Sequence, residues 1–403
     1  MVRTDLLNWL IRLRDFRRYL EIGAHERHIT FNHVHCEHKR FVTGHGADNF
    51  FEACQEKYDL VFIDGIHTET QASKDILNAL RVLRNGGVIV VHDCMPPDAW
   101  HQREPEWYEE GQAWNGTVWK AALRIFNESS YKCDLLDADW GCGIIDTAFN
   151  AKAKGLSMPH VLNYEEHYAL LLDYKKSEAE YIRNFVNVFY HLACMGNWKQ
   201  VFQEQVTQLS RNGFEQINLS VLGTSEDLLT ISSICSNLNL KSNIVFHGED
   251  MTYFETPALR AIEIFAKNNS GYVLYLHSKG VSNPDDQTKT KWRHLMMREL
   301  VEKWQTCMLA LPHYDVVGVN WREMYNISHF SGNFWYAAVK HIRKLANFNC
   351  YYDNPRFIIY DQIDNKRLGC EFWISSSSER PKVLSLFCNN VDFGNGVFLR
   401  NLS

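Results

Sequence analysis

The sequence predicts an α/β protein made of two doubly wound domains, and three observations lead to this prediction. Helix-like and strand-like segments alternate regularly in both halves of the chain, which is typical of a sheet covered by helices on both faces. A charged, helical stretch at about residues 151–186 separates the two series. The 403 residues, 45% of them hydrophobic, are sufficient to form two separate cores.

The first half begins with an amphipathic helix and continues with alternating strands and helices. The predicted elements are a helix at 6–16, a strand at 18–24, a helix at 49–56, a strand at 58–65, a helix at 69–83 and a strand at 88–93. The Arg-Asn-Gly-Gly turn at 84–87 is expected to stop the preceding helix. This alternation predicts a parallel sheet with right-handed crossovers.

The second half repeats the alternation with different sequences. Its predicted elements are a helix at 197–213, strands at 216–223 and 242–248, a helix at 257–269, a strand at 271–280, a helix at 291–311 and a strand at 314–321. We therefore expect a first domain at 1–180 and a second at 186–403.

Composition and charge exclude several classes of protein. A net charge of −6 and a pI near 6.3, with no basic domain, argue against nucleic acid as a partner. The eleven cysteines are scattered and never form a Cys-x-x-Cys pair, as expected of reduced thiols in a cytoplasmic protein. The N-terminal residues are apolar only at helical spacing, which predicts neither a signal peptide nor a transmembrane segment. No pattern indicates an oligomeric state.

Groups able to bind a metal or move a proton follow the predicted strands of the first half. The stretch GGVIVVHDCMPP at 86–97 ends its strand in His92 and Asp93. Ligands of open α/β sheets bind at the carboxyl ends of the strands. The motifs YLEIGA, YDLVFIDGIH, LRNGGVIVVHDCMPP, WNGTVWK and DWGCGIID, in this order, resemble class I S-adenosylmethionine-dependent methyltransferases over residues 1–180.

The resemblance implies a Rossmann-like fold with S-adenosylmethionine as cofactor. Glu21 and Gly23 would line its site, and Asp64 and Gly65 would lie at the mouth of a neighbouring strand. Glu37, sixteen residues after Glu21, is our prediction for the acid that binds the ribose.

The resemblance also implies an acceptor site beside Asp93. Some relatives bind a divalent cation through acids at these strand ends, which makes Asp64 and Asp93 candidate metal ligands. Without a metal, His92 or His67 would be the general base, because histidine titrates nearest neutral pH.

The second half is similar to bacterial and viral glycosyltransferase-like proteins with a GT-A type fold. The motifs FYHLACMGNWKQVFQEQ, FETPALRAI, VLYLHSKGVS, KWRHLMMRELVEKW, VVGVNW, HFSGNFWYA and CEFWI carry this resemblance across residues 189–374. It implies a nucleotide-sugar donor near Gly223. Where such folds usually have Asp-x-Asp, this chain has His277 and Lys279, and a lysine can replace the metal as a fixed positive charge on the departing diphosphate. The loop acids Asp285 and Asp286 are the alternative metal ligands.

Two further motifs of the second half suggest the sugar and acceptor sites. In HFSGNFWYA, Ser331 and Gly332 would let a sugar approach the backbone, with Asn333 and Trp335 beside it; the alternative is a buried aromatic corner. Glu371 in CEFWI is our candidate for the base that deprotonates the acceptor hydroxyl.

Together the two resemblances predict a bifunctional enzyme that transfers a sugar and methylates a sugar hydroxyl. The partner would be a glycan or glycolipid acceptor, in the bacterial cytosol or the cytosol of a virus-infected host. One alternative keeps only the glycosyltransferase active, because Arg27 stands where methyltransferases usually have a second glycine. Another makes both halves non-catalytic glycan-binding modules, because Asp-x-Asp is missing.

Overall fold

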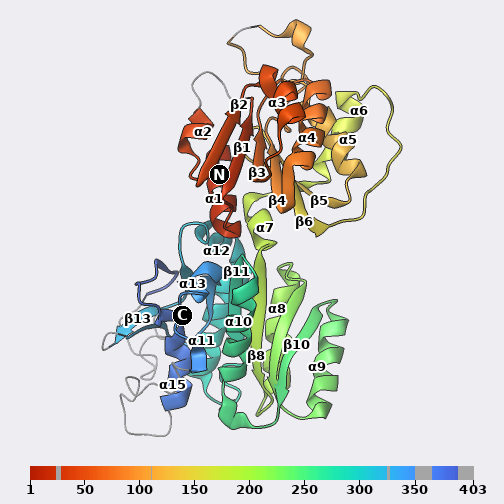
Figure 1. Cartoon of the computed structure of the whole chain (residues 1–403). Coiled ribbons are helices and arrows are strands. Elements are labelled where there is room, and N and C mark those ends of the chain that lie inside the picture. Colours follow the sequence, from red (N-terminus) through yellow and green to blue (C-terminus); the bar gives the residue numbers. More distant parts are fainter. Residues whose placement is uncertain (24–28, 110, 325–326, 350–364, 389–403) are drawn as a thin grey trace. The chain divides into compact units, whose positions relative to one another are not determined.

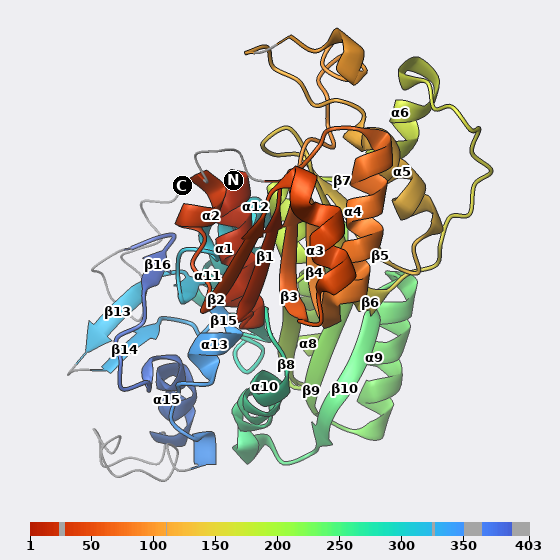
Figure 2. The same cartoon turned by 45° about the horizontal axis from the view of Figure 1, so that its top comes forward.

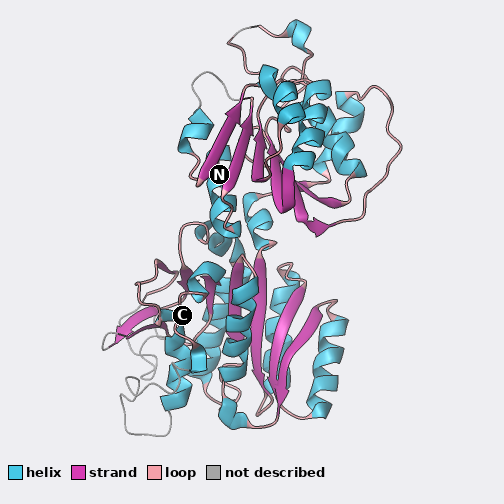
Figure 3. Ribbon diagram, in the orientation of Figure 1, coloured by secondary structure: helices cyan, strands magenta, loops and turns pink. Residues whose placement is uncertain are grey.

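The computed structural model describes residues 1–23, 29–109, 111–324, 327–349 and 365–388. The chain forms two compact units, Met1–Tyr181 and Ile182–Ser403, each with its own sheet and helices (Figure 1, Figure 3). No helix within the described ranges is long and apolar enough to cross a membrane.

The first unit is a seven-stranded sheet in the order β2-β1-β3-β4-β6-β5-β7. Its strands are β1 (Arg18–Ile22), β2 (His38–Val42), β3 (Tyr58–Ile63), β4 (Leu83–Val91), β5 (Tyr131–Leu136), β6 (Cys142–Asn150) and β7 (Lys175–Lys176). Its helices are α1 (Arg3–Arg14), α2 (Ile29–His33), α3 (Ala47–Ala53), α4 (Glu69–Val82), α5 (Val118–Glu128), α6 (Tyr164–Leu172) and α7 (Glu178–Arg183), with short 3₁₀ turns at Gly44–Gly46 and Pro105–Trp107.

The core of this sheet follows from the apolar runs in its strands. β3 is almost entirely buried, and α4 packs on β3 and β4 with α3 and α5 at its sides (Figure 2). The Thr68 side chain caps α4 by accepting a hydrogen bond from the Gln71 backbone N–H. The helix ends at Val82, but the 84–87 stretch does not form a separate turn, because it lies inside β4 where the register with β3 shifts.

The prediction of a parallel sheet is correct for the pairs among β1 to β4 and for β5 with β7, but not for β6, which runs antiparallel to both β4 and β5. The connection at 137–141 is too short for a crossover helix, so β5 and β6 form a hairpin. Asp139, Trp140 and Gly141 all adopt positive φ in this tight turn. The turn brings Asp139 and Trp140 to the edge of the sheet where β4 ends.

The second unit has a seven-stranded sheet in the order β10-β9-β8-β11-β15-β12-β16 and a separate hairpin of β13 and β14. The strands are β8 (Val186–Ala193), β9 (Gln216–Leu222), β10 (Lys241–Gly248), β11 (Tyr272–His277), β12 (Val316–Gly318), β13 (Trp321–Met324), β14 (Ile327–Phe330), β15 (Trp335–Ala338) and β16 (Val383–Ser385). The helices are α8 (Trp198–Arg211), α9 (Ser225–Asn237), α10 (Thr256–Asn268), α11 (Gln287–Met297), the π-helix Arg298–Glu302, α12 (Trp304–Ala310), α13 (Val339–Ile342) and α15 (Asn365–Phe372), with 3₁₀ turns at Met251–Tyr253 and Trp373–Ser375.

Three expectations for this unit need correction. The first strand is β8, which we did not predict as a strand, so the strand that ends in VLG is the second one. The expected helix at 291–311 is broken, because a π-helical turn at Arg298–Glu302 separates α11 from α12. The sheet is mixed rather than parallel, since β15 pairs antiparallel with β11 and β12. The GT-A fold of this unit stays a prediction.

We expect Gly23→Ala to destabilise the first unit strongly. Gly23 has φ +95°, and an added Cβ would lie 2.1 Å from the Gly65 Cα. The ends of two strands therefore approach closely at Gly23. An added methyl group would clash with Gly65, and this steric strain adds to the cost of the unfavourable φ. Thermal and denaturant unfolding of the full chain should show a loss on the order of 3 kcal/mol or more.

Gly155→Ala is the matched control for this change. Gly155 also has positive φ, at +60°, but nothing lies within 4 Å of an added Cβ. This control should cost only about 1 kcal/mol. Equal losses for the two variants would show that the contact with Gly65 is unimportant.

Candidate active site

The pocket of the first unit lies at the carboxyl ends of β1, β3 and β4. The chain places β2 on one side of β1 and β3 on the other, and such a reversal of strand order opens a crevice between crossover connections. The pocket has a volume of about 600 Å³. The residues that line it are Arg3, Glu21, Gly23, Ile29, Thr30, Asp64, Gly65, His67, His92, Asp93, Ala113, Trp114 and Trp140.

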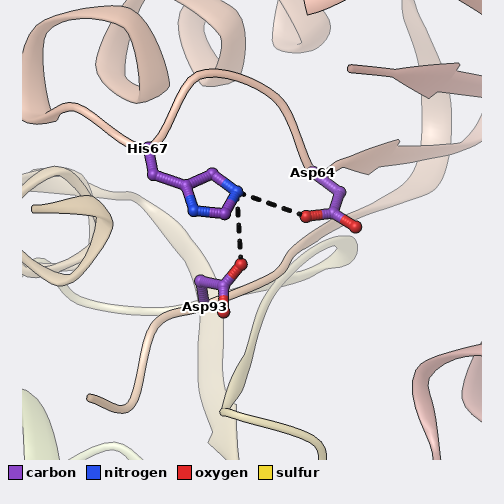
Figure 4. A group of neighbouring side chains, drawn as sticks. All are labelled: Asp64, His67 and Asp93. Atoms are coloured by element: carbon purple, nitrogen blue, oxygen red, sulfur yellow. Dashed lines mark ion pairs between the residues drawn. The ribbon is translucent and has the colours of Figure 1, made fainter. Parts of the chain in front are cut away.

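Three side chains in this pocket converge on one point. The His67 Nε2 atom lies 3.6 Å from the Asp64 Oδ1 atom and 3.4 Å from the Asp93 Oδ2 atom (Figure 4). One ligand atom of each residue lies within 4.8 Å of those of the other two. Two carboxylates and an imidazole form a donor set that suits a divalent cation. The sequence predicted Asp64 and Asp93 as metal ligands, and the structure brings them together with His67.

The WNGTVWK segment holds this cluster in place. The His67 Nδ1 atom lies 3.1 Å from the Trp114 carbonyl oxygen, which fits a proton on Nδ1 and leaves Nε2 facing the two acids. The buried Asn115 donates a hydrogen bond from Nδ2 to Asp93 Oδ1 at 2.9 Å. Gly116 has φ +61°, and a Cβ there would lie 1.9 Å from the His67 carbonyl oxygen. Only glycine fits this position without moving His67.

Asp93 itself has a strained backbone, with φ +62° two residues after the end of β4. A left-handed conformation is uncommon for a residue other than glycine, and such strain is concentrated at functional sites. It turns the Asp93 side chain back toward the pocket, where it meets His67, His92 and Asn115.

Electrostatics in the cluster favour a protonated His67 and an ionised Asp64. Burial lowers the pKa of His67, but hydrogen bonding to Asp64 and the charges of Asp64 and Asp93 raise it by more, so that it lies above the ordinary value. Burial raises the pKa of Asp64, but hydrogen bonds from His67 and His92 lower it by more, and the result is well below the usual range. A cation bound to these acids would compete with that proton.

His92 lies behind the cluster and is only 4% exposed. Its Nδ1 atom is 2.9 Å from Asp93 Oδ2, and its Nε2 atom is 2.7 Å from Arg3 Nη1. Burial lowers the pKa of His92, but three carboxylates, beginning with Asp139, raise it well above the ordinary value. Arg3 and the carboxylates together engage both ring nitrogens of His92. With both nitrogens engaged, His92 orients Asp93 and is not placed to act as a base.

Glu21 is the other carboxylate of the pocket, and it is almost fully buried. It accepts a hydrogen bond from the Tyr19 hydroxyl at 2.5 Å. Burial raises the pKa of Glu21 to about 7, which outweighs the opposing effect of the Tyr19 bond.

One prediction for this pocket is not supported, and another is not tested. Glu37 precedes β2 and therefore lies at the amino end of the strand, whereas the pocket forms at the carboxyl ends; its exposed side chain pairs with His38 and Arg17. Arg27 lies outside the described residues. Sequence reasoning also missed Arg3, Asn115 and Asp139, although Asn115 and Asp139 lie within or beside quoted motifs.

The second unit has a pocket of about 400 Å³ at the carboxyl ends of β9, β8 and β11. It is lined by His191, Ala193, Met195, Leu222, Met251, Thr252, Phe254, Glu255, His277, Ser278, Lys279, Gly280, Val281 and Ser282. His277 and Lys279, which the sequence predicted, thus line one pocket. Burial lowers the pKa of His191 to about 4, so this imidazole is neutral near pH 7.

The HFSGNFWYA segment is a buried corner, contrary to the expected sugar site. Trp335 is 0% exposed and donates from Nε1 to Asn333 Oδ1, so its ring is covered by protein. A Cβ on Gly332 would lie 2.5 Å from Trp292 Nε1, so the space beside it is filled by a side chain. Ser331 donates its backbone N–H to the Asn320 carbonyl oxygen and does not line the pocket.

The remaining predicted residues of this unit also lie off the pocket. Gly223 follows the pocket residue Leu222, but the space beside it is occupied by Cys194 and Asp227. Glu371 is a half-buried residue on α15 that does not line the pocket. Asp286 caps α11 by accepting hydrogen bonds from two backbone N–H groups, which gives it a structural role, and Asp285 is exposed.

Comparison with known proteins finds a match to a family in each unit. Residues 3–94 match the family described as Methyltransferase domain, and residues 185–378 match the family described as Domain of unknown function (DUF8361). Residues 3–94 are therefore similar to a methyltransferase domain, and they belong to a unit with a mixed α/β fold. No curated protein matches the sequence.

Several solved structures are distantly similar to part of the chain, and three of them are methyltransferases by name. A proposed O-methyltransferase from Klebsiella pneumoniae is 14% identical over 37% of this chain and 80% of its own, with a TM-score of 0.27. A proposed caffeoyl-CoA O-methyltransferase from Staphylococcus aureus is 18% identical over 36% and 82%, with a TM-score of 0.26. The MycE methyltransferase of mycinamycin biosynthesis, in complex with Mg, SAH and mycinamycin VI, is 16% identical over 38% and 51%, with a TM-score of 0.24.

We predict that Glu21 makes the stability of the first unit fall as the pH rises. Its pKa is raised from 4.5 to about 7 in the folded state, so between these values the folded chain holds a proton that the unfolded chain has lost. The folded state is therefore destabilised as pH rises through this window, by up to about 3 kcal/mol above it.

Glu21→Gln should remove this dependence, because the amide resembles the protonated acid. Unfolding measured at pH 5 and pH 8 should show the variant close to wild type at the lower pH and more stable at the higher. Glu37→Gln, at an exposed position, is the control and should follow wild type. A parallel pH dependence for wild type and Glu21→Gln would contradict the assignment.

Proposed function

We propose that the first unit transfers the methyl group of S-adenosylmethionine to a hydroxyl oxygen, with a divalent cation held by Asp64, His67 and Asp93. The convergence of these three residues in a strand-end pocket of a methyltransferase domain carries the proposal. Bound S-adenosylmethionine supplies an electrophilic methyl group. The acidic Glu21 lines the same pocket beside β1, where it would accept hydrogen bonds from the amine of the cofactor.

The residues of the cluster fit a cation for three reasons. Asp64 and Asp93 supply negative charge, and the bond from His67 Nδ1 to a backbone carbonyl oxygen aims Nε2 at both acids. Asn115 fixes Asp93, and its own buried Oδ1 has no hydrogen-bond partner among the described residues, which suits a site completed by a further group. When bound, a divalent cation lowers the pKa of a hydroxyl that it contacts.

Without the cation, the same residues would support a different proton route. His67, rather than His92, is then the base once its Nε2 has lost the proton that Asp64 and Asp93 favour, because His67 Nε2 faces the pocket while both ring nitrogens of His92 are engaged. Either route requires a hydroxyl acceptor beside Asp93. We propose a sugar hydroxyl of a glycan or glycolipid, whose ring the pocket residues Trp114 and Trp140 would contact.

Asp64→Asn and Asp93→Asn should each weaken Mn²⁺ binding, followed by electron paramagnetic resonance, by a factor of about 10². Each variant loses a charged ligand oxygen while the pocket keeps its shape. Binding of S-adenosylmethionine, measured by calorimetry, should change only a few-fold. Asp98→Asn is the control, because Asp98 is exposed and bonds only to its local loop.

Unchanged Mn²⁺ affinity in both variants would reject the cation site. Methylation of a hydroxyl acceptor at full rate in excess EDTA would also reject it and leave the His67 route. If wild type binds no S-adenosylmethionine at millimolar concentration, the first unit is a scaffold.

We propose glycosyl transfer from a nucleotide sugar as a second function, carried by the second unit. The pocket at the carboxyl ends of β9, β8 and β11, with Lys279 on its wall, supports it. In this proposal Lys279 stabilises the departing diphosphate, so transfer needs no added divalent cation.

Lys279→Ala should lower the turnover of nucleotide-sugar hydrolysis or transfer by a factor of about 10², because charge builds on the diphosphate mainly in the transition state. The KM of the donor should change far less. Lys291→Ala, at an exposed position of α11, is the matched control. Loss of all wild-type activity in EDTA would overturn the metal-free route, and absence of any donor turnover would favour a glycan-binding module.

A further inference from the structure

The pocket of the second unit contains an acid that the sequence motifs did not single out. Glu255 lies directly before α10 and lines the pocket, although only 10% of its side chain is exposed. A buried carboxylate is costly unless hydrogen bonds or charges compensate it. The contacts of each carboxylate oxygen therefore show what this acid is built to do.

One oxygen of Glu255 is fully committed to the protein. Oε2 accepts hydrogen bonds from the Tyr275 hydroxyl at 2.7 Å and from Asn333 Nδ2 at 2.6 Å. Asn333 is oriented in turn by Trp335, which donates from Nε1 to Asn333 Oδ1 at 2.8 Å. Tyr275, Asn333 and Trp335 are all buried, so this network fixes the position of the carboxylate.

The other oxygen lacks such partners. Oε1 lies 3.9 Å from His277 Nε2, which is beyond hydrogen-bond distance, and Nε2 is itself 2.9 Å from the Gly332 carbonyl oxygen. No hydrogen bond to Oε1 is found within the described part of the chain. Because Glu255 lines the pocket, Oε1 is the acceptor that the pocket offers to a ligand.

Two residues next to this acid in space, one of them its neighbour in the chain, have a strained backbone. Phe254, directly before Glu255, has φ +47° and ψ −136°, and Asn333 has φ +57°. Neither is glycine, so both conformations cost free energy that the surrounding packing must offset. The strain occurs at the residue that precedes the acid and at a residue that binds it.

We propose that this pocket binds a saccharide, with a sugar hydroxyl donating a hydrogen bond to Glu255 Oε1. A sugar carries donor hydroxyls at its edge and apolar C–H groups on its faces. The pocket offers one charged acceptor together with the apolar side chains of Met195, Met251 and Phe254. The neutral His191 adds no charge near the acid. The inference rests on the proposed second function only for the class of ligand, a saccharide. It assigns to Glu255 the contact with a sugar hydroxyl that the sequence suggested for Glu371.

The test uses the full chain and a set of monosaccharides, namely glucose, galactose, mannose and rhamnose. Binding is measured by saturation-transfer difference NMR and titration. Wild type should bind at least one of them at millimolar concentration, and Glu255→Gln should weaken that binding at least about tenfold, since a hydrogen bond to a charged acceptor is lost. The fully O-methylated sugar, which has no donor hydroxyl, should not compete.

Two controls separate binding from folding. Glu249→Gln changes an exposed acid in the preceding loop and should leave sugar affinity unchanged. Tyr275→Phe removes one donor from Oε2 but leaves Oε1 in place, so a folded variant should lose less affinity than Glu255→Gln. The melting temperature of each variant establishes that it is folded.

Equal sugar affinity in wild type and folded Glu255→Gln would overturn the proposal, as would the absence of any sugar binding by wild type. Competition by the O-methylated sugar would also overturn it, because Glu255 would then accept nothing from the ligand. Sugar binding that depends on Glu255, with no turnover of any nucleotide sugar, would support this site and reject glycosyl transfer.

Discussion

In both sheets the strand order reverses beside the first strand, and both pockets depend on this reversal. β1 has β2 on one side and β3 on the other, while β8 has β9 on one side and β11 on the other. Connections leave such a strand in opposite directions, so the carboxyl ends at the reversal stay uncovered. Residues at or just after the strand ends thereby line a pocket although they are distant in sequence, as Asp64 and Asp93 do in the first unit and His191 and His277 do in the second.

The two pockets compensate their negative charge in different ways, and this difference decides what each is proposed to bind. In the first unit Asp64 and Asp93 share one point with His67, and Arg3 and His92 lie behind them. In the second unit the single carboxylate of Glu255 is compensated by neutral donors, Tyr275 and Asn333. Two carboxylates with an imidazole favour binding of a cation. One carboxylate with an oxygen that accepts no hydrogen bond from the described residues favours a ligand hydroxyl that donates one.

The main errors of prediction came from features that local sequence does not encode. Gly332 and Trp335 form a motif that is typical of a sugar-binding site, but Trp292 and the surrounding core fill the space beside them. The antiparallel β6 follows from a short turn at 137–141 that our reading of alternating elements passed over. Glu37 was chosen by its spacing from Glu21, and spacing alone does not say at which end of β2 a residue lies.

The sequence by itself determined the alternating elements of both halves and the strand ends that carry Glu21, Asp64, Asp93 and Lys279, because apolar periodicity and turn residues are local signals. Only the tertiary structure decided which of these groups meet. Asn115 reaches Asp93, and Asn333 reaches Glu255, across long stretches of chain, through packing that no local pattern records. Those contacts also decide which oxygen of a buried carboxylate faces a pocket. The oxygen that the protein's own donors do not reach stays available to a ligand, and the positions of these donors are set by the tertiary structure.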